Sequence, residues 1–260
     1  PILICAGTVV KGGNQDRQIG QDIVIQAGSS VPVDAFCVEQ GRWNNERLGE
    51  ATDGQFRGAA TNAMIGVRSK GQYEIAQDAV WVEVSKVKSR VLKKVNAMPA
   101  AAPAQRALIA DNSSLAIAQD EYEDLTREEI EAVCRKVRAH FAGFEKENAP
   151  VGYAYALNGK PVNVRSFAHA RVFDKQFDPF LRAMATESLL AEEVEFEAPT
   201  ASQVVALVKE IQKAEEERRE TAAANWNGVR KNLRGFAANC YVVPEGQDAQ
   251  VIVTRDWTAK

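Results

Sequence analysis

The sequence predicts an α+β fold, in which a mixed or antiparallel β-sheet with hairpins packs against several helices. The first third of the chain reads mainly as short strands and turns, the middle contains long segments with helical periodicity, and two later segments read as β-hairpins. This order lacks the regular alternation of strand and helix that is typical of a doubly wound parallel sheet. We expect a single domain over residues 1–260, with a loop or sub-domain break near 96–112.

Short strands fill the first third of the chain. Apolar and β-branched residues, separated by turns that contain Gly, Asn and Ser, predict strands at 1–5, 8–10, 22–26 and 31–38. The polar, glycine-containing segment 44–58 is predicted to be a loop, and 59–67 a short helix.

Helical periodicity dominates the middle of the chain. Four valines fit helical spacing within 75–92, although part of the same segment also fits a strand, and its length favours a helix (Val80, Val84, Val87 and Val91). Thr126 and Glu129 match a capping box, which predicts a helix over 126–144. Between these two helices, the alanine- and proline-rich segment 96–106 is the best linker candidate.

The last part of the chain combines hairpins and helices. Asn158 and Gly159 favour a type I′ turn, which predicts a hairpin from strands at 151–157 and 162–167, and Pro161 suggests that the second of them is an edge strand. Helices are expected at 178–191 and 200–221, the second opened by a capping box of Thr200 and Gln203. A second hairpin, from 236–243 and 249–255, closes the chain.

Composition and charge exclude several classes of protein. Of 260 residues, 45% are hydrophobic and 26% charged, and the formal net charge is −3, which argues against a nucleic-acid-binding protein. No apolar run reaches the roughly 18 to 20 residues of a membrane span, so we expect no membrane partner. Four scattered cysteines favour a reducing, cytoplasmic compartment. The chain begins abruptly in strand-like sequence, so we expect native residues ahead of Pro1.

Common catalytic and cofactor motifs are missing from the sequence. It contains no glycine-rich dinucleotide or phosphate loop, no HExxH and no GxSxG. Two histidines and dispersed cysteines do not make a zinc-binding pattern. The sequence therefore predicts no metal site and no cofactor.

The segment 37–43 concentrates reactive and binding groups at the end of a predicted strand. It places a thiol, a carboxylate, a guanidinium and an indole within seven residues, namely Cys37, Glu39, Arg42 and Trp43. Glu39 and Cys37 are therefore the catalytic candidates, while Arg42 can hold an anion and Trp43 can stack on a planar ligand. The alternative is an ordinary strand end with a Glu39–Arg42 ion pair.

Two further segments contribute candidate ligand-binding residues. In Gly12–Arg17 the glycines let the backbone approach an anion that Arg17 neutralises, with Gln15 beside it, although a plain turn explains the same pattern. Gln77 and Trp81 are four residues apart and would share one face of a helix.

These segments together resemble a known protein family. The runs Gly12–Arg17, Cys37–Trp43 and Gln77–Trp81, followed by Asn158-Gly159-Lys160, resemble a bacterial family of unknown function. That family is named for gene association with ADP-ribosylglycohydrolases and rhodanese-phosphatase-like proteins. The resemblance implies a neighbourhood in nucleotide or ADP-ribose metabolism but no established activity.

Two functions remain open from the sequence. The first is a non-catalytic binding or assembly module, which senses a nucleotide-like ligand or forms a homo-oligomer, and the lack of a catalytic motif favours it. The second is an enzyme that acts on an ADP-ribose-like or phosphorylated small molecule, with Arg17 and Arg42 holding anionic groups and Glu39 acting as acid or base.

Overall fold

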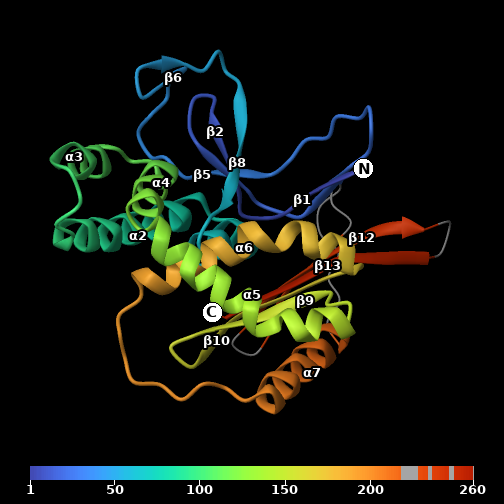
Figure 1. The fold of residues 1–260 in the computed structure, drawn as a ribbon. Helices are drawn as coiled ribbons and strands as arrows, with labels where there is room; N and C mark the ends of the chain where they lie inside the picture. Colours follow the sequence, from blue (N-terminus) through green and yellow to red (C-terminus); the bar gives the residue numbers. More distant parts are fainter. Residues whose placement is uncertain (218–227, 234–235, 246–248, 260) are drawn as a thin grey trace. The chain divides into compact units, whose positions relative to one another are not determined.

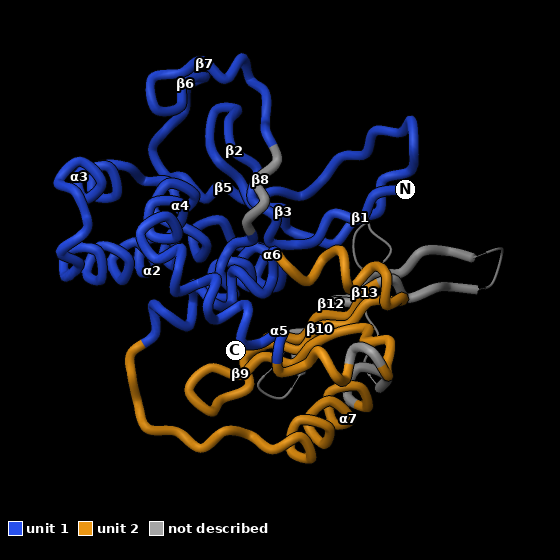
Figure 2. Tube along the Cα trace, viewed as in Figure 1, with its two compact units in different colours: residues 1–139, 179–191 blue, residues 140–178, 192–260 orange. Residues whose placement is uncertain are grey.

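The computed structural model describes residues 1–217, 228–233, 236–245 and 249–259. It confirms the α+β class, with helices and several antiparallel sheets (Figure 1). The chain forms two compact units, one of residues 1–139 and 179–191 and the other of residues 140–178 and 192–260 (Figure 2). Residues 96–112 lie within the first unit. The single domain expected from the sequence stays a prediction, because it concerns how the two units act together.

A four-stranded antiparallel sheet forms one part of the first unit. Its strands lie in the order β5 (Ala35–Cys37), β3 (Arg17–Ile19), β2 (Thr8–Gly12) and β8 (Phe56–Asn62). Two small antiparallel pairs accompany it, β1 (Ile2–Ile4) with β4 (Ile23–Ile25) and β6 (Glu46–Arg47) with β7 (Glu50–Ala51).

Helices make up the rest of the first unit. They are α1 (Ile65–Ser69), the π-helical turn η1 (Lys70–Glu74), α2 (Gln77–Ala97), α3 (Pro103–Asp111) and α4 (Leu115–Leu125). Parts of α5 (Arg127–Glu147) and α6 (Ala170–Leu190) also belong to it. The helix α2 buries five valines at helical spacing, from Val80 to Val95, against Val38, Leu115 and Tyr122 of the core. Figure 1 shows α3 and α4 beside α2, in agreement with their mutual contacts.

The second unit contains a five-stranded antiparallel sheet. Its order is β11 (Gly228–Leu233), β12 (Phe236–Glu245), β13 (Ala249–Ala259), β10 (Lys160–Phe167) and β9 (Gly152–Leu157). The helix α7 (Ala201–Glu217) packs Ile211 against Val164 and Trp257 of this sheet. Arg165 and Asp256 form an ion pair of 2.7 Å in which neither side chain is exposed.

The predicted hairpins and most predicted helices are confirmed. Asn158 and Gly159 both have positive φ, as a type I′ turn requires, and join β9 to β10. The capping box at Thr200 is also confirmed, since its N–H donates to Gln203 Oε1 and its hydroxyl accepts from the Gln203 N–H. The strands of the closing hairpin are β12 and β13, and the residues between them lie outside the described part of the chain.

Several local predictions are wrong. The segment 59–67 is not one helix, because its first residues extend β8, which pairs with β2, and α1 begins only at Ile65. The strand expected over 31–38 is confirmed only as β5, because Val31 and Val33 face solvent. The strand β3 was not predicted. The predicted linker 96–106 is a short connection, with Pro103 at the first position of α3, where its missing N–H costs nothing.

Three further predictions, of a capping box, an edge strand and a helix start, differ from the structure. Thr126 ends α4 and its hydroxyl donates to the Tyr122 carbonyl, so it forms no capping box, although the following helix exists. The strand β10 is interior, yet its pairing with β13 begins only at Asn163, so Pro161 breaks no bond of that ladder. The helix predicted at 178–191 begins at Ala170 and contains Pro179.

Candidate functional site

A buried carboxylate lies at the centre of the residues that the sequence analysis selected. Asp16 follows the turn between β2 and β3, and its side chain has no exposed surface. Its oxygens accept hydrogen bonds from Arg47 Nε at 3.0 and 3.1 Å, from the Ser114 hydroxyl at 2.8 Å and from the Gly12 N–H at 2.9 Å. The charge of Asp16 is therefore neutralised and its lone pairs are used.

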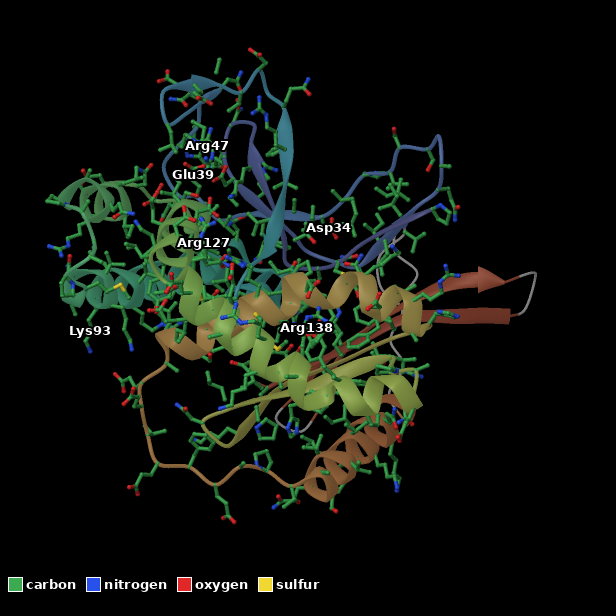
Figure 3. All side chains as sticks on the ribbon, in the orientation of Figure 1. Asp34, Glu39, Arg47, Lys93, Arg127 and Arg138 are labelled. Carbon is green, nitrogen blue, oxygen red and sulfur yellow. The ribbon has the colours of Figure 1, made fainter. Side chains whose placement is uncertain are left out.

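A second ion pair, between a buried carboxylate and a partly buried arginine, adjoins Asp16. Glu39 Oε2 lies 2.7 Å from Arg42 and accepts the Asp16 N–H at 2.8 Å. The Arg42 guanidinium also donates to the carbonyls of Gly13 at 2.9 Å and Gly12 at 3.1 Å. We call Gln15, Asp16, Cys37, Glu39, Arg42, Arg47 and Ser114 the buried network. Figure 3 shows Glu39 and Arg47 of this network close to one another.

The glycines of the Gly12-Gly13 turn are required by close packing. Both have positive φ, and a Cβ on Gly12 would lie 2.4 Å from the Gln55 carbonyl oxygen, while one on Gly13 would meet the Phe56 ring at the same distance. The turn thus brings the carbonyls of Gly12 and Gly13 to Arg42, so it binds a cation of the protein itself.

Cys37 is also held within the network. The Cys37 thiol donates to Gln15 Oε1 at 2.8 Å. The side-chain amide of Gln77 accepts the Cys37 N–H and donates to the Cys37 carbonyl, both at 2.8 Å. Burial raises the pKa of the Cys37 thiol, and the nearby Arg17 charge, which acts in the opposite direction, only partly offsets this. A thiol with a raised pKa is a poor nucleophile near neutral pH.

Two of the selected residues lie apart from the network's hydrogen bonds. The Arg17 guanidinium lies 6.0 Å from the centroid of the Phe56 ring. Trp43 is 65% exposed, the largest exposed fraction of any tryptophan in the described part of the chain. The structure therefore joins Gln15, Cys37, Glu39, Arg42 and Gln77, and leaves Arg17 and Trp43 outside this group.

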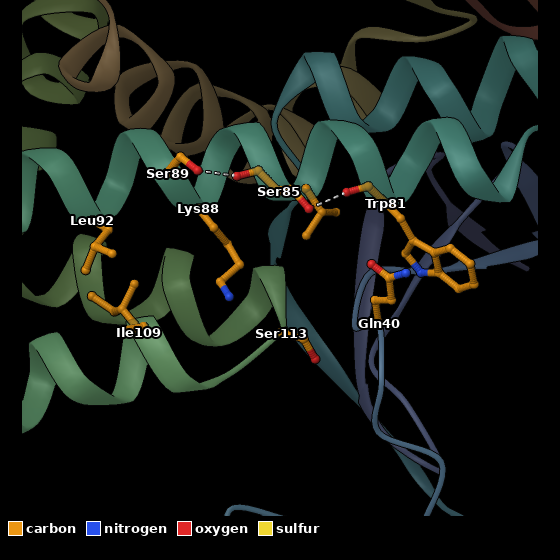
Figure 4. Close-up of a pocket in the computed structure, with 10 residues that line it drawn as sticks. Gln40, Trp81, Ser85, Lys88, Ser89, Leu92, Ile109 and Ser113 are labelled. Carbon is orange, nitrogen blue, oxygen red and sulfur yellow. Dashed lines mark hydrogen bonds between the residues drawn. The ribbon is translucent and has the colours of Figure 1, made fainter.

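A cavity of about 280 Å³ opens in the same unit, beside Trp81. Figure 4 shows its walls, which come from α2, the end of α3, the α3–α4 connection and the residue after Glu39. The lining side chains that matter for chemistry are Gln40, Trp81, Ser85, Lys88, Ser89 and Ser113, and we call this cavity the Trp81–Lys88 pocket. Its apolar part includes Leu92 and Ile109.

The pocket presents hydrogen-bond donors that the protein does not use fully. Trp81 Nε1 is buried without a hydrogen-bond partner. The Lys88 ammonium donates to the Asn112 carbonyl, and burial lowers the Lys88 pKa. The hydroxyls of Ser85 and Ser89 donate to the carbonyls of Trp81 and Ser85, which leaves only acceptor capacity on these two oxygens.

The buried network fixes the walls of the pocket. Gln40 follows Glu39 and Ser113 precedes Ser114, and Glu39 and Ser114 form a β-bridge. The Leu115 N–H donates to the Val38 carbonyl at 2.9 Å, which ties α4 to the same segment. Gln77, one helical turn before Trp81, ties α2 to Cys37. Three elements that carry pocket residues are thus held together by bonds of the network and of its neighbours Val38, Leu115 and Gln77.

The comparison with protein families agrees with the resemblance found in the sequence. The family model described as ARG and Rhodanese-Phosphatase-superfamily-associated Protein domain, ARPP-1, matches residues 1–254. The chain belongs to the ARPP-1 family. Neither a curated protein nor a solved structure matches it.

The ARPP-1 match covers both units, so the network and the pocket lie within the family domain. Within the described residues, no three His, Cys, Asp or Glu side chains gather in a way that could hold a metal ion. The described helices also include none that is both long and apolar enough to cross a membrane.

Sequence reasoning missed half of the candidate site. Asp16 lies inside the selected run Gly12–Arg17, but its position between a glycine turn and an arginine does not indicate that it accepts hydrogen bonds from several other segments. Lys88 was missed although Trp81, Val84, Lys88 and Leu92 share one face of a helix, a pattern visible in the sequence. Gln40 and Ser113 had no local signal, because only the tertiary fold brings them to α2.

Proposed function

We propose that this ARPP-1 chain is a non-catalytic binding module whose small, nucleotide-like ligand occupies the Trp81–Lys88 pocket. One observation carries the proposal: the charges of Asp16, Glu39, Arg42 and Arg47 are paired with one another, whereas the adjacent pocket offers the indole of Trp81 and a lysine, Lys88, that has no acidic partner. An indole can pack against a planar or sugar ring, and an ammonium attracts an anionic group.

The arrangement of Glu39 and Cys37 favours binding over catalysis. A general acid or base must come within hydrogen-bond reach of its substrate, yet Glu39 is 2% exposed and its Oε2 already accepts from Arg42 and Asp16. The raised pKa of the Cys37 thiol disfavours a nucleophilic role. The enzyme alternative therefore lacks an available group among the residues that the sequence selected.

The wider setting of the module is part of the same proposal. The family name associates the domain with ARG and with the rhodanese-phosphatase superfamily, which supports a role close to ADP-ribose or phosphate metabolism. Free Cys5, Cys37 and Cys134 support a reducing, cytoplasmic location, and the resemblance of the sequence to a bacterial family supports a bacterial source. Assembly into a homo-oligomer is the remaining part of the proposal, and size-exclusion chromatography with light scattering tests it.

Two tryptophans allow a matched test of the site. We expect AMP, ADP or ADP-ribose to raise the melting temperature of the chain, and Trp81→Ala to abolish the shift while Trp43→Ala leaves it unchanged. Chromatography of the incubated ligand should recover it intact. If only Trp43→Ala loses the shift, the ligand binds at the exposed Trp43 instead of in the pocket. Turnover of the ligand would favour the enzyme alternative.

A further inference from the structure

Lys88 differs from the paired cations around it. Lys11 pairs with Asp120, Arg42 with Glu39 and Arg47 with Asp16, but among the described residues no carboxylate pairs with Lys88. Burial alone accounts for its lowered pKa, and no acidic side chain counteracts that effect. A partly buried cation without a counter-charge is costly to maintain, so an anion from outside the chain would stabilise it.

The Asn112 carbonyl satisfies only part of the ammonium. Asn112 ends α3, where unpaired carbonyls carry partial negative charge, and its oxygen uses one of the three donors of the lysine. Figure 4 shows the Lys88 side chain reaching from α2 toward the α3–α4 connection, within the pocket. Two N–H donors of the ammonium therefore remain for a ligand.

Some of the remaining polar groups of the pocket can also donate, whereas the Ser85 and Ser89 hydroxyls can only accept. Trp81 Nε1 can only donate, and the Ser113 hydroxyl makes no hydrogen bond within the described part of the chain. A phosphate monoester has the complementary character, since its three terminal oxygens are strong acceptors and it carries between one and two negative charges near pH 7. A neutral ring would leave the Lys88 donors unused.

We infer that the Trp81–Lys88 pocket encloses the phosphate-monoester end of the ligand and that Lys88 is the phosphate-binding residue. This inference rests on the proposed function and names the ligand class of the same site. The cavity of about 280 Å³ lies just below the usual range for a whole drug-sized ligand, so it encloses the phosphate and its sugar. A base then extends along the indole of Trp81, at the end of the pocket beside Gln40 (Figure 4).

The lowered pKa of Lys88 gives phosphate binding a pH dependence. A bound phosphate favours the charged ammonium and raises the pKa of Lys88 above its value in the free protein. Binding therefore takes up a proton wherever the free lysine is partly neutral, and affinity falls as the pH rises through the lowered pKa. The acids of the neighbouring elements are Asp78 and Glu83 of α2 and Asp111 of α3, and none of them counteracts the burial that lowers the Lys88 pKa.

Calorimetric titration of four probes separates the phosphate from the rest of the ligand. The probes are AMP, ribose 5-phosphate, adenosine and inorganic phosphate, each titrated into wild type, Lys88→Gln and Lys93→Gln. Lys93 is the matched control because it is exposed on the same helix and does not line the pocket (Figure 3). We expect Lys88→Gln to weaken AMP and ribose 5-phosphate about 10- to 100-fold, as for loss of a charged hydrogen-bond donor, and Lys93→Gln to change neither.

The outcomes distinguish this inference from the proposed function. Equal affinities for adenosine and AMP, both unchanged in Lys88→Gln, would overturn the phosphate assignment and leave the binding module standing. If none of the four probes binds, both fail together. Lys88→Arg keeps the positive charge and should retain part of the AMP affinity, and its melting temperature shows whether the helix tolerates substitution at this position.

Discussion

The buried network and the Trp81–Lys88 pocket lie side by side in the first unit but treat polar groups in opposite ways. In the network each carboxylate meets arginines and backbone N–H groups, and Asp16 alone accepts from Gly12, Arg47 and Ser114. In the pocket an indole N–H has no partner and a lysine has no acid. The difference favours a scaffold role for the segments Gly12–Arg17 and Cys37–Trp43, and it supports the proposal that the ligand binds to the pocket residues beside them.

Removal of the network's hub should have the largest effect. Asp16→Ala leaves the partly buried Arg42 and Arg47 without their shared carboxylate, so we expect the free energy of unfolding to fall by about 3 to 5 kcal/mol. Urea denaturation followed by circular dichroism measures this. Asp124→Ala is the control, because its pair with Arg127 is more than half exposed and should contribute less than about 1 kcal/mol.

The same variant tests the relation between scaffold and pocket. If Asp16→Ala loses less than about 1 kcal/mol, the network does not hold the fold, and a direct ligand role for its charges becomes the better interpretation.

Glu187 of α6 lies between these two extremes, because it is a buried carboxylate of which only part is hydrogen-bonded. Its carboxylate accepts the Gly66 N–H and lies near Arg68, Arg90 and Glu83, but Oε2 has no hydrogen-bond partner. Burial raises the pKa of Glu187 to about 7, against the attraction of Arg90 and Arg68. Glu187 is therefore expected to be partly protonated at neutral pH.

The raised pKa of Glu187 predicts a stability that falls with pH. The folded protein holds this proton more tightly than the unfolded chain, so stability is highest below the ordinary value of 4.5 and declines as the pH rises through about 7. The difference corresponds to about 3 kcal/mol at most.

Replacement by a neutral isostere isolates this effect. Glu187→Gln should be more stable than wild type at pH 8 by up to about 3 kcal/mol, with a flatter pH profile, whereas the exposed Glu128→Gln should keep the wild-type profile. Denaturation at pH 5, 6, 7 and 8 gives the comparison. Parallel profiles for wild type and Glu187→Gln would show that Glu187 is ionised over the whole range.

The sequence predicts elements well where the pattern is local. The valines of α2, the Asn158-Gly159 turn and the Thr200 capping box depend on neighbours within a few residues, and each is confirmed. Predictions fail where a distant strand decides the conformation. Residues 59–62 extend β8 because β2 pairs with it. Thr126 is an exception with a local cause, since its hydroxyl donates to the Tyr122 carbonyl one turn earlier in α4.

The candidate site shows the same division. Glu39 and Arg42, three residues apart, form the ion pair that their spacing suggests. Contacts from Asp16 to Ser114 and from Gln77 to Cys37 span long stretches of the chain, so no local pattern can predict them. The pocket depends on these long-range bonds, so the sequence shows that Lys88 shares a helix face with Trp81 but not that this face lines a pocket.

The smallest effect on stability is expected at Cys37, and the reactivity of its thiol shows whether it has a structural or a nucleophilic role. Because burial raises the thiol pKa, the thiolate population near pH 7.5 is low, and Cys37 should react with iodoacetamide far more slowly in the folded chain than in urea. Mass spectrometry of the labelled peptides measures the rates, with the half-buried Cys134 as an internal reference.

Cys37→Ser keeps a donor for Gln15 Oε1, so we expect it to retain AMP binding and to lose no more than about 1 kcal/mol of stability. Rapid alkylation of native Cys37, with a rate that levels off below pH 7, would instead reveal a thiolate inside the network and revive the enzyme alternative.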